Sequence, residues 1–195
     1  MTVEEVVKEI LRDRIFYETS DGGVTLSGGE PLLQPDFSRA ILERCKAEEL
    51  HTAIETAANC QWIGLARLLP VTDIIIMDIK HLNPDKHCEV TDVSNKLILQ
   101  NVRLLAQTSK PIIIRVPVVP MVNDTPEEIG AIIQFVGAFQ NLQYLELLPF
   151  HRLGESKYHN LGLNYPASHL KTLTKEKMSQ LAARAKESGV EVRIG

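Results

Sequence analysis

Apolar residues recur along this chain in two alternating patterns, one with helical spacing and one in short uninterrupted runs. The helical spacing predicts helices over about 2–17, 36–48, 61–69, 95–107, 125–139 and 175–187. The short runs, which are rich in β-branched residues, predict strands over 24–26, 51–55, 71–79, 111–119, 142–148 and 191–194. Residues 81–94 are polar and predict no regular element. At 36–48, Asp36 is the expected cap of the helix.

The run Ile74-Ile75-Ile76-Met77 indicates the fold class, because it is apolar on both faces. Such a run is typical of a strand buried inside a parallel sheet. Strands that alternate with helices predict an α/β fold with crossover helices. With 195 residues and no visible linker or repeat, the chain is expected to form one domain over 1–195.

Polar residues follow or interrupt the predicted strands, which matters because function in α/β folds gathers at the carboxyl ends of strands. The first strand leads into Gly28-Gly29-Glu30, where two glycines leave room for a ligand to approach the backbone. The later strands carry Glu55, Thr56, Asp78, Lys80, Arg115 and His151. Carboxylates can hold an amino group, and a lysine or arginine can hold a carboxylate. Together these residues favour a zwitterionic, amino-acid-like ligand.

Each of these residues also has a structural interpretation. For Glu55 or Asp78 taken alone, a role as a helix cap or as a partner of Lys80 is favoured. Arg115 favours function, because a buried cation without a partner is costly, whereas the two interpretations of His151 are evenly balanced. The remaining histidines have no metal-ligand spacing and are expected at the surface: His51, His81, His87, His159 and His169. The cysteines lack a Cys-x-x-Cys spacing and are expected to be buried or inert: Cys45, Cys60 and Cys88.

Composition narrows the possible partners and the compartment. The net charge of −4 argues against nucleic acid and against an anionic membrane surface. No apolar run approaches the roughly 20 residues that a membrane helix needs, and the acidic start is no signal peptide. The low cysteine content suits a reducing compartment. These features predict a cytoplasmic protein.

Four motifs in order give the chain a specific resemblance. They are Gly-Gly-Val-Thr-Leu-Ser-Gly-Gly-Glu-Pro-Leu at 22–32, Asp-Ile-Lys at 78–80, Arg-Val-Pro-Val-Val-Pro at 115–120, and Leu-Leu-Pro-Phe-His at 147–151 followed by Gly154. With these motifs the chain resembles the glycyl radical enzyme activating proteins of the radical S-adenosylmethionine superfamily. The family fold is a partial parallel (β/α)6 barrel, so the resemblance implies an open sheet with outer helices that lacks the first strand of the barrel.

The resemblance implies how S-adenosylmethionine would be held. In the family, the segment matching Gly28-Gly29-Glu30 binds the amino group, and residues matching Lys80 and Arg115 handle the carboxylate. A residue matching His151 lies near the adenosine part. The methionine end, sometimes with a monovalent cation, is lined by residues at the positions of Glu55, Thr56 and Asp78.

The resemblance also implies an activity and partners. The family reductively cleaves S-adenosylmethionine to a 5′-deoxyadenosyl radical, which abstracts a hydrogen from a glycine of a partner enzyme. The implied partners are a glycyl radical enzyme of the pyruvate formate-lyase type and an electron donor such as flavodoxin or ferredoxin.

One departure from the family is large. The family holds a 4Fe–4S cluster by a Cys-x-x-x-Cys-x-x-Cys loop, and the cysteines of this chain do not have that spacing. We therefore expect the chain to be the C-terminal part of an activating enzyme, inactive as given, with an exposed edge at 24–26 that promotes self-association. Two alternatives remain: a cluster-less module that binds S-adenosylmethionine or a partner protein, and an unrelated barrel lyase that uses Lys80 as a Schiff base.

Overall fold

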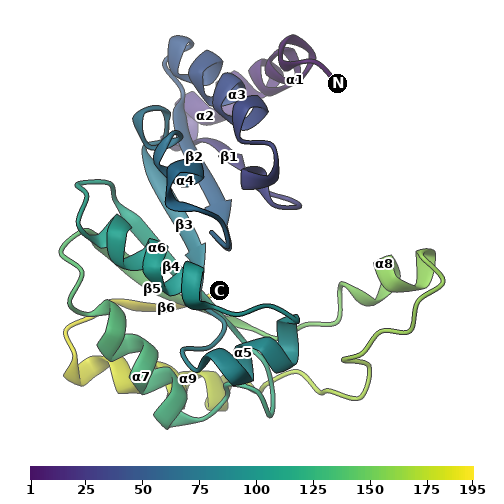
Figure 1. The fold of residues 1–195 in the computed structure, drawn as a ribbon, viewed down its shortest axis with the longest axis vertical. Helices are drawn as coiled ribbons and strands as arrows, with labels where there is room; N and C mark the ends of the chain where they lie inside the picture. The colour runs from purple at the N-terminus through teal and green to yellow at the C-terminus, as the bar shows by residue number, and fades with distance from the viewer. The chain divides into compact units, whose positions relative to one another are not determined.

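The computed structural model describes residues 1–195, with the side chains of all except 186 and 187. Six strands form one sheet in the order β1-β2-β3-β4-β5-β6 (Figure 1). Their bounds are β1 Gly23–Leu26, β2 His51–Thr56, β3 Ile74–Asp78, β4 Ile112–Val118, β5 Leu142–Pro149 and β6 Val192–Ile194. Neighbouring strands pair in parallel, and the sheet is open because β1 and β6 are its two ends. The predicted parallel α/β fold is confirmed.

Helices separate the strands along the chain. The α-helices are α1 Val3–Ile10, α2 Arg14–Ser20, α3 Pro35–Ala47, α4 Trp62–Ala66, α5 Pro84–Thr91, α6 Lys96–Ala106, α7 Pro126–Val136, α8 Glu155–Asn160 and α9 Lys175–Ala183. Short 3-10 helices span Leu11–Asp13, Pro31–Leu33, Leu69–Val71 and Arg184–Glu187. None of the helices described is long and apolar enough to cross a membrane.

The chain divides into two compact units. Unit 1 consists of Met1–Asp78, Lys96–Ile113 and Phe139–Gln143, and unit 2 consists of Ile79–Asn95, Ile114–Ala138 and Tyr144–Gly195. The predicted site residues are therefore distributed over both units.

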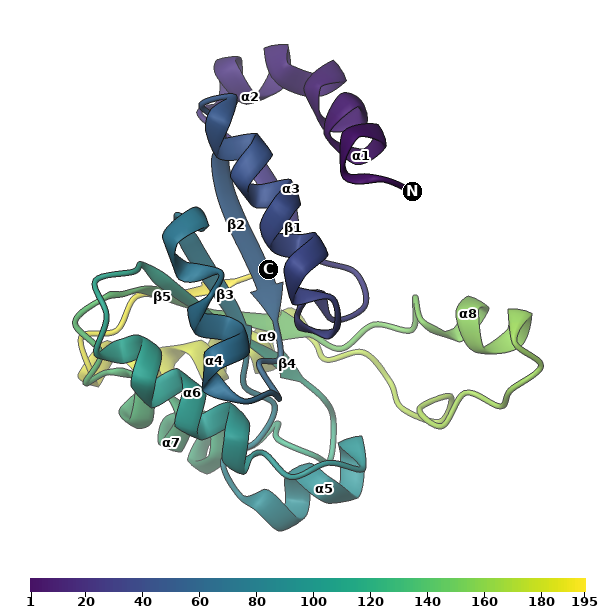
Figure 2. The ribbon, with the colours of Figure 1, turned by 45° about the horizontal axis from the view of Figure 1, so that its top comes forward.

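In unit 1, α1 and α3 pack together beside β1 and β2 (Figure 2). Their shared core contains Val24, Ile41, Cys45 and Leu50, with apolar residues of the first helix packed against it. In β1, Gly23 lies opposite His51 of β2, and a Cβ at Gly23 would be only 2.1 Å from the His51 carbonyl oxygen. Glycine at this position is thus required by the close approach of the two strands.

In unit 2, α7 and α9 pack against each other, and β6 pairs with β5. Thr125 caps α7: its hydroxyl accepts a hydrogen bond from the Glu128 amide at 3.2 Å. The segment between β5 and α9 makes a long excursion that carries α8 (Figure 1).

Four details of the sequence prediction are wrong. The first helix is not continuous over 2–17, because a 3-10 turn at Leu11–Asp13 separates α1 from α2. Residues 81–94 contain α5, whose start is fixed by Asn83: its side chain accepts from the amides of Asp85 and Lys86. Asp36 does not cap α3 but lies in its first turn, where it pairs with Arg67.

The fourth error concerns two histidines, His81 and His87, which are buried and not at the surface. Burial is possible because their ring nitrogens are hydrogen-bonded. His81 contacts Glu128 and accepts from the Asn83 amide, and His87 contacts the Val93 carbonyl.

Candidate functional site

The glycine loop after β1 offers an open stretch of backbone. Gly28 has a φ of +110°, a backbone conformation that favours glycine. The backbone geometry alone therefore explains why this residue is a glycine. Gly29 has no such constraint, and a Cβ built on it would meet nothing within 4 Å. The packing of the chain therefore does not require glycine at position 29. Because no side chain covers the backbone at Gly28 and Gly29, a ligand has room to approach it closely.

Glu30 follows the two glycines, and its carboxylate binds the chain itself. Its Oε1 accepts from the Thr56 hydroxyl at 2.6 Å and from the Leu32 amide at 3.1 Å, while Oε2 accepts from the Ala57 amide at 3.0 Å. The glycine loop is thereby joined to the end of β2. The structure brings Glu30 and Thr56 together, as their common location at strand ends predicts.

Glu55 lies on the same strand end, and its carboxylate accepts a hydrogen bond from the Ser27 hydroxyl at 3.1 Å. Ser27 directly precedes Gly28, so this contact is a second link between the glycine loop and β2. Asp78 is the last residue of β3 in the same unit.

Unit 2 holds the cationic part of the predicted site. The Ile79 amide donates to the Arg115 carbonyl at 2.9 Å, which places Lys80 directly after a backbone contact with β4. The Phe150 amide donates to the Val118 carbonyl at 3.0 Å, which places His151 at the end of the neighbouring strand. Lys80 and His151 thus lie just beyond the ends of β3 and β5, whereas Arg115 lies within β4, the strand between them.

Arg115 is paired within the sheet. Its Nε donates to the carboxylate of Glu146 on β5 at 2.7 Å, and both side chains are mostly buried. The expectation that a cation inside an apolar strand needs a partner is confirmed. Glu146 was not identified from the sequence; its signal is a single acidic residue within the apolar strand 142–148.

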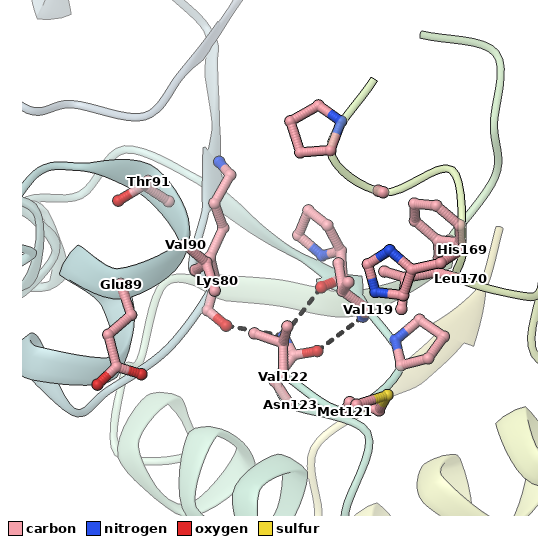
Figure 3. Close-up of a pocket in the computed structure, with 15 residues that line it drawn as sticks. Lys80, Glu89, Val90, Thr91, Val119, Met121, Val122, Asn123, His169 and Leu170 are labelled. Atoms are coloured by element: carbon pink, nitrogen blue, oxygen red, sulfur yellow. Dashed lines mark hydrogen bonds between the residues drawn. The ribbon is translucent and has the colours of Figure 1, made fainter. Parts of the chain in front are cut away.

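A cavity of about 560 Å³ lies beside Lys80 in unit 2 (Figure 3). Its lining is predominantly apolar and includes Pro117, Val119, Met121, Phe150, His169 and Leu170. Side chains at i and i+2 of a strand share a face, so Arg115 lies on the same face of β4 as Pro117. Among the lining residues Lys80 is basic and Glu89 is acidic. A mostly apolar cavity with a few polar groups is typical of a small-molecule site.

Asn123 holds the wall of this cavity together and was missed by the sequence analysis. The fully buried side chain donates to the carbonyls of Lys80 at 2.7 Å and Pro117 at 2.9 Å, and accepts from the Val119 amide at 2.7 Å (Figure 3). It therefore fixes the backbone of Lys80 relative to the end of β4. The contact with Lys80 spans 43 positions, so a local sequence pattern does not reveal it.

The cysteines do not fit an iron–sulfur cluster. Cys45 is buried in the core of unit 1, Cys60 is partly buried and Cys88 is exposed on α5. The expectation of buried or inert thiols is met by burial at Cys45, and inertness of the other two stays a prediction. Burial raises the pKa of the Cys45 and Cys60 thiols, and the charge of Glu30 adds to the effect at Cys60, so the thiolate needed for iron is disfavoured. Among the described side chains, no group of three His, Cys, Asp or Glu residues could hold a metal ion.

Comparison with known proteins supports the family that the sequence motifs resemble. The family model described as the radical SAM superfamily matches residues 1–136. The chain is 40% identical over 171 residues to the pyruvate formate-lyase-activating enzyme of Staphylococcus epidermidis. The aligned region covers 85% of this chain and 68% of the relative. The chain belongs to the glycyl radical enzyme activating enzymes of the radical SAM superfamily.

Two further comparisons define the extent of the match to these activating enzymes. The (2S)-3-sulfopropanediol dehydratase activating enzyme of Klebsiella oxytoca is 43% identical over 173 residues, which is 88% of this chain but 55% of that protein. The chain thus spans little more than half of this relative. A solved domain of the pyruvate-formate lyase-activating enzyme from Bacteroides vulgatus aligns with a TM-score of 0.76 and 28% identity, covering 89% of this chain and 99% of that chain. Members of the superfamily use S-adenosylmethionine and a 4Fe–4S cluster.

Proposed function

We propose that this chain supplies the part of an activating enzyme that holds S-adenosylmethionine. The open backbone at Gly28 and Gly29 is the observation that carries the proposal, because it leaves room that the chain does not fill. In this proposal the glycine loop binds the amino group of the methionine part. Glu55, Thr56 and Asp78 line the methionine end, in accord with their places at the ends of β2 and β3.

Lys80 and Arg115 bind the carboxylate in this proposal. A guanidinium anchored through Nε by Glu146 has a restricted orientation, which favours a defined contact with a planar carboxylate. His151 lies near the adenosine part. Its neighbour Phe150 lines the apolar cavity of unit 2, whose composition suits a nucleoside base.

We further propose that the activating enzyme acts on a glycyl radical enzyme of the pyruvate formate-lyase type, in the cytoplasm, with a flavodoxin or ferredoxin as electron donor. The chain by itself does not perform the cleavage, because its cysteines do not fit the cluster that supplies the electron in this superfamily. The 43% identity to the activating enzyme of a dehydratase supports a glycyl radical enzyme as partner and leaves its substrate open.

A second candidate function is a cluster-less module that binds S-adenosylmethionine or a partner protein. The combination of an open glycine loop with cysteines that do not fit a cluster favours it. A module for S-adenosylmethionine shares ligand binding with the first candidate, a module for a partner protein does not, and radical chemistry belongs to the first candidate alone.

Calorimetric titration of S-adenosylmethionine into the chain tests the proposed site. We expect binding with a dissociation constant on the order of micromolar, or about −8 kcal/mol. Arg115→Lys is expected to weaken it about tenfold, because a lysine keeps the charge but loses the planar donor fork. No heat of binding at millimolar ligand would contradict the proposal, and equal affinity of the variant would remove Arg115 from the site.

A further inference from the structure

Asn101 is a buried polar residue in the middle of α6. Its side chain is 1% exposed, in a helix whose buried face is otherwise apolar. The Nδ2 group donates to the carbonyl of Ala58 at 2.8 Å and to that of Cys60 at 2.9 Å. Both carbonyls belong to the loop that follows β2, so one amide group holds this loop at two points.

The loop residue that Asn101 holds has an unfavourable backbone conformation. Ala58 has a φ of +49° and is fully buried. The left-handed region is disfavoured for a residue with a Cβ, and it persists only where surrounding contacts impose it. The hydrogen bond from Asn101 to the Ala58 carbonyl is such a contact.

The turn at Ala58 directly follows the two residues that hold Glu30. The Ala58 amide donates to the Thr56 hydroxyl oxygen at 2.8 Å, and that hydroxyl donates to Glu30 Oε1 at 2.6 Å. The Ala57 amide donates to Glu30 Oε2 at 3.0 Å. The carboxylate that follows the glycine loop is therefore held by Thr56 and Ala57, and the Thr56 hydroxyl is itself held by the Ala58 amide.

We propose that Asn101 is a positioning residue for the ligand-binding glycine loop, acting through Ala58 and Thr56 on Glu30. It holds the turn at Ala58, the turn aims the donors at Glu30, and Glu30 fixes Gly28 and Gly29 against the end of β2. The ligand assigned to this loop rests on the proposed function, whereas the positioning itself does not. Asn101 is remote in sequence from the loop, which is why no motif marks it.

The experiment compares Asn101→Ala with Asn141→Ala. Asn141 is a matched control in unit 1, because its Nδ2 likewise donates to backbone carbonyls, that of Leu105 in the last turn of α6 and those of Thr108 and Lys110 in the loop after it. Amide hydrogen exchange is measured at Leu32 and Ala57, the two backbone donors to Glu30. Asn101→Ala should accelerate exchange at both about tenfold, as expected when a buried hydrogen bond is lost. Asn141→Ala should leave both unchanged.

A second variant separates positioning from general destabilisation. Glycine adopts the left-handed conformation without strain, so adding Ala58→Gly to Asn101→Ala should restore most of the protection at Ala57. Calorimetry with S-adenosylmethionine should show the same order: about tenfold weaker binding for Asn101→Ala, recovery in the double variant, and no change for Asn141→Ala.

The outcomes distinguish the inference from the proposed function. If the wild-type chain does not bind S-adenosylmethionine, the proposed function fails, while the exchange data still decide the role of Asn101. Unchanged exchange at Leu32 and Ala57 in a folded Asn101→Ala variant overturns the inference. Equal effects of the two asparagine variants, or no recovery with Ala58→Gly, overturn it as well.

Discussion

At Gly29 the chain leaves open a space that its own packing does not need, and at Gly23 it leaves none. A Cβ at position 29 meets nothing within 4 Å, whereas one at position 23 would lie 2.1 Å from a backbone oxygen of His51. The motif at 22–32 thus contains glycines that are needed for two different reasons. Position 23 serves strand pairing, and position 29 is explained by the proposed ligand.

This difference predicts opposite results for two identical substitutions. Gly29→Ala should change the free energy of unfolding by less than about 0.5 kcal/mol but weaken binding of S-adenosylmethionine. Gly23→Ala should destabilise the fold by about 1–3 kcal/mol, because the paired strands must move apart. Urea unfolding and calorimetry measure the two quantities. A Gly29→Ala chain that binds as well as the wild type would exclude the glycine loop from the site.

Asp73 gives a residue-scale prediction for pH. Partial burial would raise the pKa of its carboxyl, but hydrogen bonds from Lys46 and from the amide and hydroxyl of Thr52 outweigh it and lower the pKa. A lowered pKa in the folded state means that the carboxylate contributes stability above its unfolded pKa, about 3.9. That contribution is lost as the pH falls through the lower, folded pKa.

Asp73→Asn should therefore destabilise the chain at pH 7, by about 1–2 kcal/mol for a charged hydrogen-bonded pair. The difference from the wild type should shrink as the pH falls below about 4. Urea unfolding at a series of pH values measures it. A difference that stayed constant down to pH 2 would show that the charge of Asp73 is not the source.

At the scale of elements, β1 is the end strand of the sheet. An edge strand presents backbone donors and acceptors that can pair with another chain. Thr25, the exposed side chain of this strand, carries no charge that would prevent such pairing. The predicted position of this strand at an edge of the sheet is confirmed, and its availability for self-association remains a prediction.

Sedimentation velocity at increasing protein concentration tests this prediction. The wild-type chain should associate, and Thr25→Lys should reduce association because a charge on an edge strand opposes edge-to-edge pairing. Gln100→Lys, at an exposed position of α6, adds the same charge away from the edge and should have no effect. A wild-type chain that stays monomeric at every concentration would refute the prediction.

At the scale of the whole molecule, the chain combines an open glycine loop, which we propose binds S-adenosylmethionine, with cysteines that do not suit iron. Anaerobic reconstitution of this chain with iron and sulfide should therefore give no 4Fe–4S cluster, because three converging thiolates are needed. Visible absorbance and bound iron per chain measure the outcome. A stoichiometric cluster would show that the cysteines rearrange, and the proposal of an inactive chain would fail.

The fold class was predictable because it depends on short-range patterns. An apolar run such as 74–77 indicates a buried parallel strand wherever it occurs, and the alternation with helices limits the topology. Element boundaries were less predictable. The break at Leu11–Asp13 and the helix α5 depend on local caps and turns, which the hydrophobic pattern does not resolve.

The sequence by itself determined which candidate residues stand in or just after strands, because the motifs containing Gly28, Lys80, Arg115 and His151 follow the strand pattern directly. Only the tertiary structure decided what holds them. Glu146 acts through a hydrogen bond to a residue 31 positions away, Asn101 to residues 41 and 43 positions away, and Asn123 to residues 4, 6 and 43 positions away. Most of these contacts exist only after strands and helices have packed, so chain patterns cannot reveal the partners. The tertiary structure likewise showed that Gly23 is required by packing and Gly29 is not.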